Sequence, residues 1–126
     1  MFAAFLRSIR DVLVGPEVRI REDSPELLSV QWRRTLTEFD RRSGAIRQDS
    51  GLVASFSLVD WVELRPRHVA RDSIHWVVAL HLGSHRQLEV GESRDQEEAS
   101  IVTAHISTAT AKPVRVRDDS GALRAA

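Results

Sequence analysis

The chain has 126 residues, of which 42% are hydrophobic and 29% are charged, proportions that are ordinary for one globular domain. Its 18 basic and 18 acidic residues cancel, which argues against nucleic acid as a partner. Cysteine is absent, which excludes disulfides, zinc–thiolate sites and thiol nucleophiles. No apolar run reaches the roughly 20 residues needed to span a bilayer.

The basic charge comes almost entirely from arginine, since Lys112 is the only lysine. We interpret this as the codon bias of a GC-rich bacterial genome. We therefore expect a bacterial, cytoplasmic protein, with peripheral attachment at the inner membrane as the alternative.

An amphipathic helix is predicted for residues 1–15. Apolar side chains recur there at helical spacing with polar side chains between them, and Gly15 and Pro16 end the pattern. Its apolar face is predicted to contain Phe2, Phe5, Leu6 and Ile9. Such a helix packs on its own sheet, docks on a partner, or lies in a membrane interface. The sequence leaves these alternatives open.

The middle of the chain alternates between apolar and polar residues in the manner of β-strands. We predict strands at 18–21, 28–39, 45–48, 52–56, 61–64, 74–82 and 86–90. A β-bulge or bend near Arg33 and Arg34 would explain a shift in the apolar pattern of the second strand. Turns are predicted at 40–44, 49–51 and 83–84, and residues 65–73 are predicted to form a polar, basic loop.

A helix is predicted at 93–111. Ser93 is a favourable N-cap, Gln96 would complete a capping box, and Pro113 follows the last turn. Val114 and Val116 are consistent with a final short strand, and residues 118–126 are predicted to be a flexible tail. The whole pattern predicts a mostly β, α+β domain over residues 16–117. It would be a bent antiparallel sheet or partly open barrel, capped by the C-terminal helix.

No catalytic or metal-binding motif is found. His75 and His81 lie roughly 20 Å apart along one predicted strand, which is too far for a shared metal ion. His81 and His85 flank a turn, but no third ligand accompanies them. There is no nucleophile elbow and no phosphate-binding glycine loop. We predict no enzyme, no catalytic residue, no metal site and no cofactor.

The basic residues are the strongest candidates for a binding site. A rim that meets a phosphate or an acidic partner is predicted to contain Arg65, Arg67, His68 and Arg71 from one loop, with Arg33 and Arg34 beside it. The alternative is a solvated loop whose charges are balanced by nearby acids.

Residues 35–116 resemble bacterial pleckstrin-homology-like (PH-like) domains. The resemblance is carried by TLTEFDRRSGAI as a hairpin, FSLVDWVEL as a strand entry, and WVVALHLGSHRQLEVGESRDQEEASIVTAHI as strand, turn, strand and helix. It implies a bent sheet or partly open barrel plugged by the helix, serving as a lipid-, peptide- or protein-binding module. It implies no particular site residue, because the family shares a fold more than a site.

These observations predict a non-catalytic binding or assembly module that acts through protein–protein contacts. A sheet edge or rim loop would form the contact, and the N-terminal helix would dock. The alternative is a peripheral membrane module that binds anionic lipid through the N-terminal helix and the arginine-rich loop. A protein partner is expected, a membrane surface and a homo-oligomer are further options, and nucleic acid is not expected.

Overall fold

The computed structural model describes residues 17–126, so the predicted helix with Phe2, Phe5, Leu6 and Ile9 lies outside the described residues. The described part is mostly β, with two five-stranded sheets and an α-helix, α2 (Gln96–Thr110). A short 3-10 helix, Phe56–Leu58, joins one sheet to the other. The prediction of a mostly β domain with a C-terminal helix is confirmed.

The first sheet is an antiparallel meander in chain order. Its strands are β1 (Arg19–Asp23), β2 (Leu27–Trp32), β3 (Thr35–Asp40), β4 (Ala45–Gln48) and β5 (Gly51–Ser55). The β-bulge or bend predicted near Arg33 and Arg34 is a two-residue hairpin turn, because Trp32 pairs directly with Thr35. The chain reverses at this point, and that reversal explains the shift in the apolar pattern.

The second sheet has the order β10-β9-β6-β7-β8. Its strands are β6 (Val59–Ala70), β7 (Ser73–Leu82), β8 (Arg86–Ser93), β9 (Val114–Arg117) and β10 (Leu123–Ala125). β9 follows the helix and runs parallel to β6. Strand β10 lies within residues 118–126, which were predicted to be a flexible tail, and it pairs antiparallel with β9.

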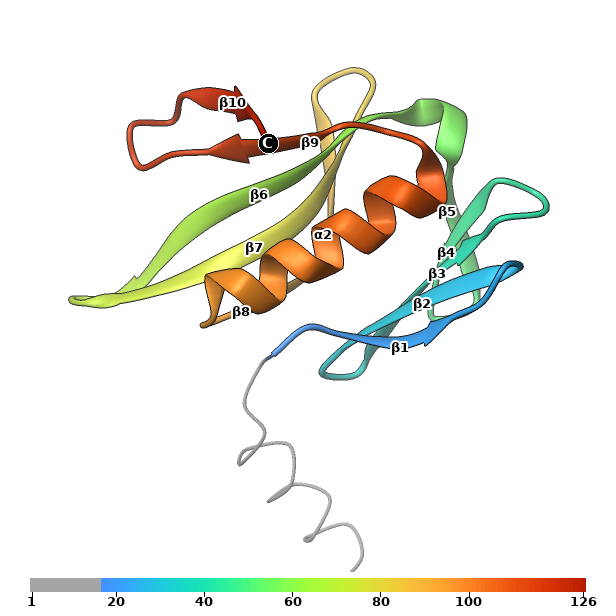
Figure 1. The fold of residues 1–126 in the computed structure, drawn as a ribbon, viewed down its shortest axis with the longest axis horizontal. Coiled ribbons are helices and arrows are strands. Elements are labelled where there is room, and N and C mark those ends of the chain that lie inside the picture. The colour runs from blue at the N-terminus through green and yellow to red at the C-terminus, as the bar shows by residue number, and fades with distance from the viewer. Residues whose placement is uncertain (1–16) are drawn as a thin grey trace, which may run out of the picture.

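Helix α2 lies across the open side between the two sheets (Figure 1). All three layers share one apolar core, to which Phe39 and Ile46 contribute from the first sheet, Val78 and Leu80 from the second, and Ile106 from α2. Burying each such side chain stabilises the fold by roughly 1.5–3 kcal/mol. The helix is therefore the third wall of the core, and the sheets do not close into a barrel.

The two sheets are joined at one corner, where the start of β1 meets the end of β8. The backbone N–H of Val18 donates to the carbonyl oxygen of Glu92 at 2.8 Å. Gly91 allows this close approach, because a Cβ atom there would lie 2.7 Å from both the Trp32 Cβ and the Val18 Cγ2.

The helix begins later than predicted. Asp95, and not Ser93, is its N-cap, and the Asp95 side chain accepts a hydrogen bond from the Glu97 N–H. Ser93 is still part of β8, fully buried, and its hydroxyl donates to Glu17. The sequence contains two residues suited to capping, Ser93 and Asp95, and the pairing of β8 with β7 decides between them.

Candidate functional site

The predicted basic loop does not exist as a loop. Strand β6 continues to Ala70 and pairs with β7 over nearly its whole length, so that only Arg71 and Asp72 form the turn. The prediction of a loop was wrong because it relied on Pro66, and proline is rare within sheets. It is tolerated here because pairing with β9 ends at Leu64, which leaves one edge of β6 free at the proline.

Arg65 and Arg67 are held in an ion-pair network with acids of β8. The Arg65 Nη2 atom lies 3.0 Å from Glu89 Oε1, and the Arg67 Nη1 atom lies 3.1 Å from Glu92 Oε2. Arg67 also pairs with Glu89, and His75 Nδ1 lies 3.0 Å from Glu92 Oε1. These arginines are already neutralised within the fold, so they are poor candidates for binding an external anion.

A buried carboxylate continues this network. Glu63 has no exposed surface, and it accepts hydrogen bonds from Trp61 Nε1 at 3.0 Å and from Arg117 Nε at 3.2 Å. Burial acts to raise its pKa, but the hydrogen bonds from Arg117 and Trp61 and the charges of Arg117 and Arg65 outweigh burial. The pKa of Glu63 therefore lies below its ordinary value. The role of this carboxylate is to tie β9 to β6.

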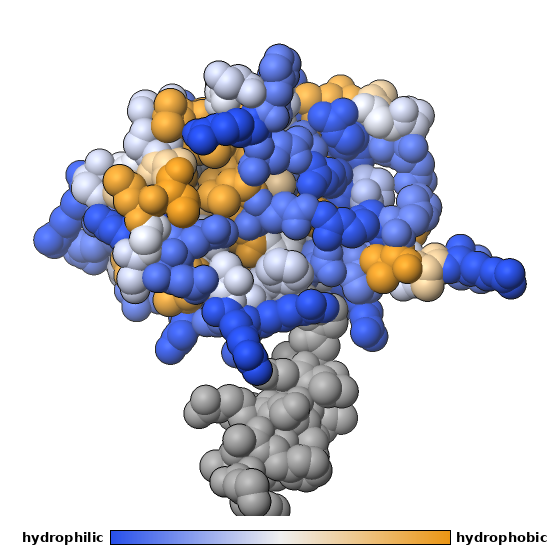
Figure 2. Space-filling view, turned by 180° about the vertical axis from the view of Figure 1, so that it is seen from behind, coloured by the Kyte–Doolittle hydropathy of each residue, from blue (hydrophilic) through white to orange (hydrophobic). Residues whose placement is uncertain are grey.

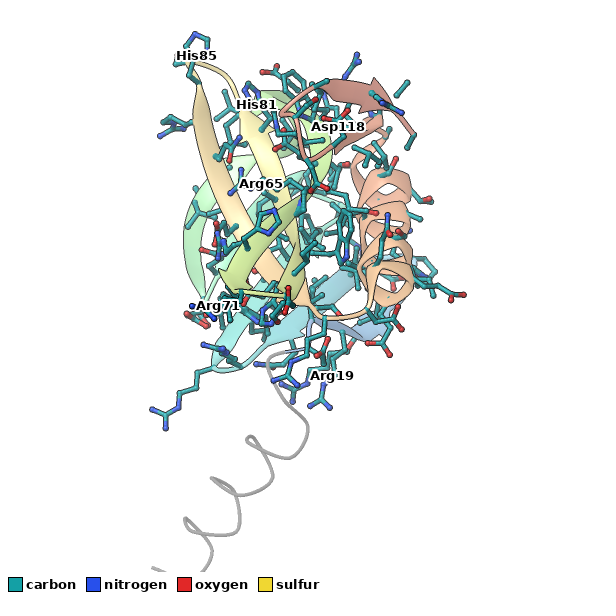
Figure 3. All side chains as sticks on the ribbon, turned by 90° about the vertical axis from the view of Figure 1, so that its left-hand side faces the viewer. Arg19, Arg65, Arg71, His81, His85 and Asp118 are labelled. Atoms are coloured by element: carbon teal, nitrogen blue, oxygen red, sulfur yellow. The ribbon has the colours of Figure 1, made fainter. Side chains whose placement is uncertain are left out.

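The histidines are dispersed over the described part of the chain. His68 is exposed, 3.8 Å from Asp119. His81 stacks on Trp61 with ring centroids 3.8 Å apart, and its Nδ1 lies 3.2 Å from Asp60 Oδ2. His85 lies at a hairpin tip, away from His81 (Figure 3). Residues 17–126 contain no group of three or more side chains able to hold a metal ion.

A different set of arginines is exposed and has no carboxylate partner among residues 17–126. We call this set the arginine-rich end, and it consists of Arg19, Arg33, Arg34, Arg71 and Arg94. Figure 3 shows Arg19 and Arg71 at the end of the molecule from which the chain continues toward residue 16, opposite His85. Their cationic groups are therefore free to meet a ligand.

The corner between β1 and β8 gathers four of these arginines, Arg19, Arg33, Arg34 and Arg94. The Arg94 backbone N–H donates to Glu17 Oε2 at 2.9 Å, which holds the start of α2 beside the start of β1. Trp32 packs against Gly91, which brings the β2–β3 turn, with Arg33 and Arg34, to the same corner. Arg71 lies at the tip of the long β6–β7 hairpin, which projects beyond this corner (Figure 1).

Arg33 is held in an unusual backbone conformation. Its φ is +54°, a left-handed value that costs a residue other than glycine roughly 1–2 kcal/mol. Its guanidinium carbon lies 5.3 Å from the centroid of the Trp32 ring, so a cation–π contact of about 0.5–1 kcal/mol offsets part of that cost.

The nearby acids do not neutralise the whole arginine-rich end. Glu17 accepts hydrogen bonds from the Ser93 hydroxyl and the Arg94 N–H, and Glu92 contacts His75 and Arg67. Asp72 adjoins Arg71, and the first turn of α2 carries further acids beside Arg94. Positive charge therefore stays in surplus at the β2–β3 turn.

The structure separates the predicted site residues into two groups. Arg33, Arg34 and Arg71 lie at the arginine-rich end, whereas Arg65, Arg67 and His68 are engaged elsewhere. Arg19 and Arg94 were not among the predicted site residues. Their proximity depends on a contact between residues 17 and 92, which no local pattern signals.

Comparisons with protein-family models, with curated proteins and with solved structures find no match for this chain. The resemblance to PH-like domains therefore stays a prediction. Among residues 17–126, no helix has the length and apolar character needed to cross a membrane.

Proposed function

We propose that this chain is a non-catalytic binding module that attaches to an anionic membrane surface through its arginine-rich end. The proposal rests on one observation. The arginine-rich end, whose exposed arginines have no carboxylate partner among residues 17–126, is the end of the domain from which the chain leads to its apolar N-terminal residues (Figure 3). The same side of the molecule would thus present both cationic and apolar groups to a membrane.

The expected energies support this combination. A basic residue near an anionic membrane surface contributes about 1 kcal/mol, so Arg19, Arg33 and Arg34 together would supply up to about 3 kcal/mol. The acids beside Arg71 and Arg94 offset part of the contribution of these two arginines. Stable peripheral attachment usually needs two signals, such as an apolar anchor with a basic patch. Phe2, Phe5, Leu6 and Ile9 would be the apolar anchor.

A matched pair of charge reversals tests the arginine-rich end. The test variant is Arg34→Glu with Arg71→Glu, and the control is Arg86→Glu with Lys112→Glu. Both change the net charge by the same amount, but Arg86 adjoins His85 at the opposite end, and Lys112 follows the far end of α2. Co-sedimentation is measured with vesicles of phosphatidylcholine and phosphatidylserine.

We expect the test variant to lose at least tenfold in vesicle affinity, since two favourable charges become repulsive, while the control keeps most of its affinity. Equal losses in both variants would mean that only net charge matters. That result would contradict a localised binding surface.

A protein partner is the second candidate, and the free edge of β5 supports it. β5 is an edge strand of the first sheet, and Leu52 is 71% exposed there, with Val53 and Leu58 also exposed. Figure 2 shows an apolar area on this side of the molecule. An edge strand with apolar side chains is a template for strand addition by a partner. Failure of the chain to bind anionic vesicles would leave this candidate in place.

A further inference from the structure

An apolar groove lies between α2 and β1, with a volume of about 540 Å³. The α2 side of the groove is formed by Glu98, Ile101, Val102 and His105. Their spacing of three, four and seven residues places them on one face of the helix. Val18, Arg19 and Ile20 form the opposite wall. The groove is thus mainly apolar, with Arg19 between the two apolar residues of the β1 wall and with Glu17, Glu98 and His105 as its other ionisable groups.

Ile101 is an apolar residue of this groove whose side chain is exposed. It is 50% exposed, although the next residue of α2, Val102, is almost fully buried. Asp23 and His105 define one end of the groove, because Asp23 Oδ2 lies 2.6 Å from His105 Nδ1. Glu17, the first described residue, belongs to the lining at the other end. The chain therefore enters the described domain within the groove itself.

We propose that this groove binds residues 1–14 of the same chain as an amphipathic helix, through the face that contains Phe2, Phe5, Leu6 and Ile9. The occupant is identified by where the chain enters the groove and by its length. Fourteen helical residues span about 21 Å, which exceeds the roughly 10 Å between Glu98 and His105 along α2. Gly15 and Pro16 lie where the chain must reverse direction.

Charge complementarity supports the same occupant. Arg7 and Arg10 are three residues apart, so they lie on one flank of such a helix, beside its apolar face. Glu98 is exposed and has no cationic partner among residues 17–126, so it is a suitable acceptor for this flank. The contact would bury Ile101 and cover the edge of β1.

This contact does not rest on the proposed membrane role. The same apolar residues serve both, so groove binding and membrane insertion exclude one another. The test must therefore be made in water without lipid, where failure of the membrane proposal has no influence on the result.

Paramagnetic relaxation enhancement tests the contact in the full chain without assuming a register. The absence of native cysteine permits one nitroxide label at Ser8→Cys, a polar position outside the proposed anchors. We expect the backbone amide signals of Ile20, Ile101 and Val102 to lose most of their intensity. A second label, at Arg86→Cys, should leave these signals unchanged.

The matched variant adds Phe5→Asp and Ile9→Asp to the Ser8→Cys label and should restore the signals, with the remaining spectrum unaltered. Loss of intensity that persists in this variant would overturn the proposal, as would no loss in the parent. A mixture of ¹⁵N protein without a spin label and ¹⁴N protein with the spin label tests whether a second copy is the occupant, because any loss of signal in it must come from contact between two chains. Signal loss in that mixture would also overturn the intramolecular contact.

Discussion

Glu63 is a fully buried carboxylate that is ion-paired with Arg65 and Arg117. Replacement by glutamine keeps its volume but removes the charge that both arginines face. We expect Glu63→Gln to lower the free energy of unfolding at pH 7 by about 2–3 kcal/mol, as for lost hydrogen bonds to charged groups. Urea denaturation of both proteins measures the difference, and an unchanged midpoint would contradict it.

Lowering the pH should reduce the contribution of Glu63 to the free energy of unfolding. In the unfolded chain Glu63 takes up a proton near its ordinary pKa of 4.5, whereas in the folded chain its pKa is lowered. Its stabilisation is therefore complete above about pH 4.5 and is lost as the pH falls through the folded pKa. The pKa values of Asp40 and Asp118 are lowered as well, and these groups act in the same direction. The wild-type midpoint should thus fall more steeply than that of Glu63→Gln.

At the scale of elements, the corner between β1, β2 and β8 depends on the absence of a side chain at Gly91. An added Cβ would lie 2.7 Å from the Trp32 Cβ and the Val18 Cγ2, neither of which is the end of a flexible side chain. We expect Gly91→Ala to destabilise the fold by about 1–3 kcal/mol, as for overpacked cores. Thermal unfolding measures this loss.

The substitution Gly83→Ala is the control for Gly91→Ala. No atom lies within 4 Å of a Cβ added there, and its φ is outside the left-handed region. We expect Gly83→Ala to keep or slightly raise the melting temperature, because alanine restricts the unfolded chain. Equal effects of the two substitutions would contradict the steric role of Gly91.

Local patterns predicted the strands well where one face is buried. Residues 74–82 and 45–48 were predicted almost as the structure has them, because apolar side chains and turn residues mark them. The extension of β6 through Pro66 was missed, because proline is rare within sheets and the residues around it are charged. That charge is tolerated because Glu89 and Glu92 of β8 compensate for Arg65 and Arg67, and this pairing appears only once the strands are in register.

At the scale of the molecule, the net charge is zero, but the positive and negative charges are unevenly distributed over the surface. Arg65 and Arg67 are neutralised on the second sheet, while Arg19 and Arg34 at the arginine-rich end have no acidic partner among the described residues. The composition alone shows only that the numbers of basic and acidic residues are equal. The β1–β8 corner creates the charged end, so its position could be predicted only in part from the sequence.

The whole-molecule account joins this end to the apolar N-terminal residues. Each signal alone would give marginal attachment, and both together would give stable attachment. Neutral vesicles should therefore bind the chain weakly, because the arginines gain little at an uncharged surface. Higher salt should also weaken attachment to anionic vesicles, since it screens exposed charges.

The most direct measurement is co-sedimentation of the full chain, and of a chain that lacks residues 1–15, with phosphatidylserine-containing and purely phosphatidylcholine vesicles. The account predicts that the full chain sediments with the anionic vesicles and not with the neutral ones, and that the deletion removes most of this binding. Absence of binding to both kinds of vesicle would contradict it. So would binding to anionic vesicles that the deletion leaves unchanged.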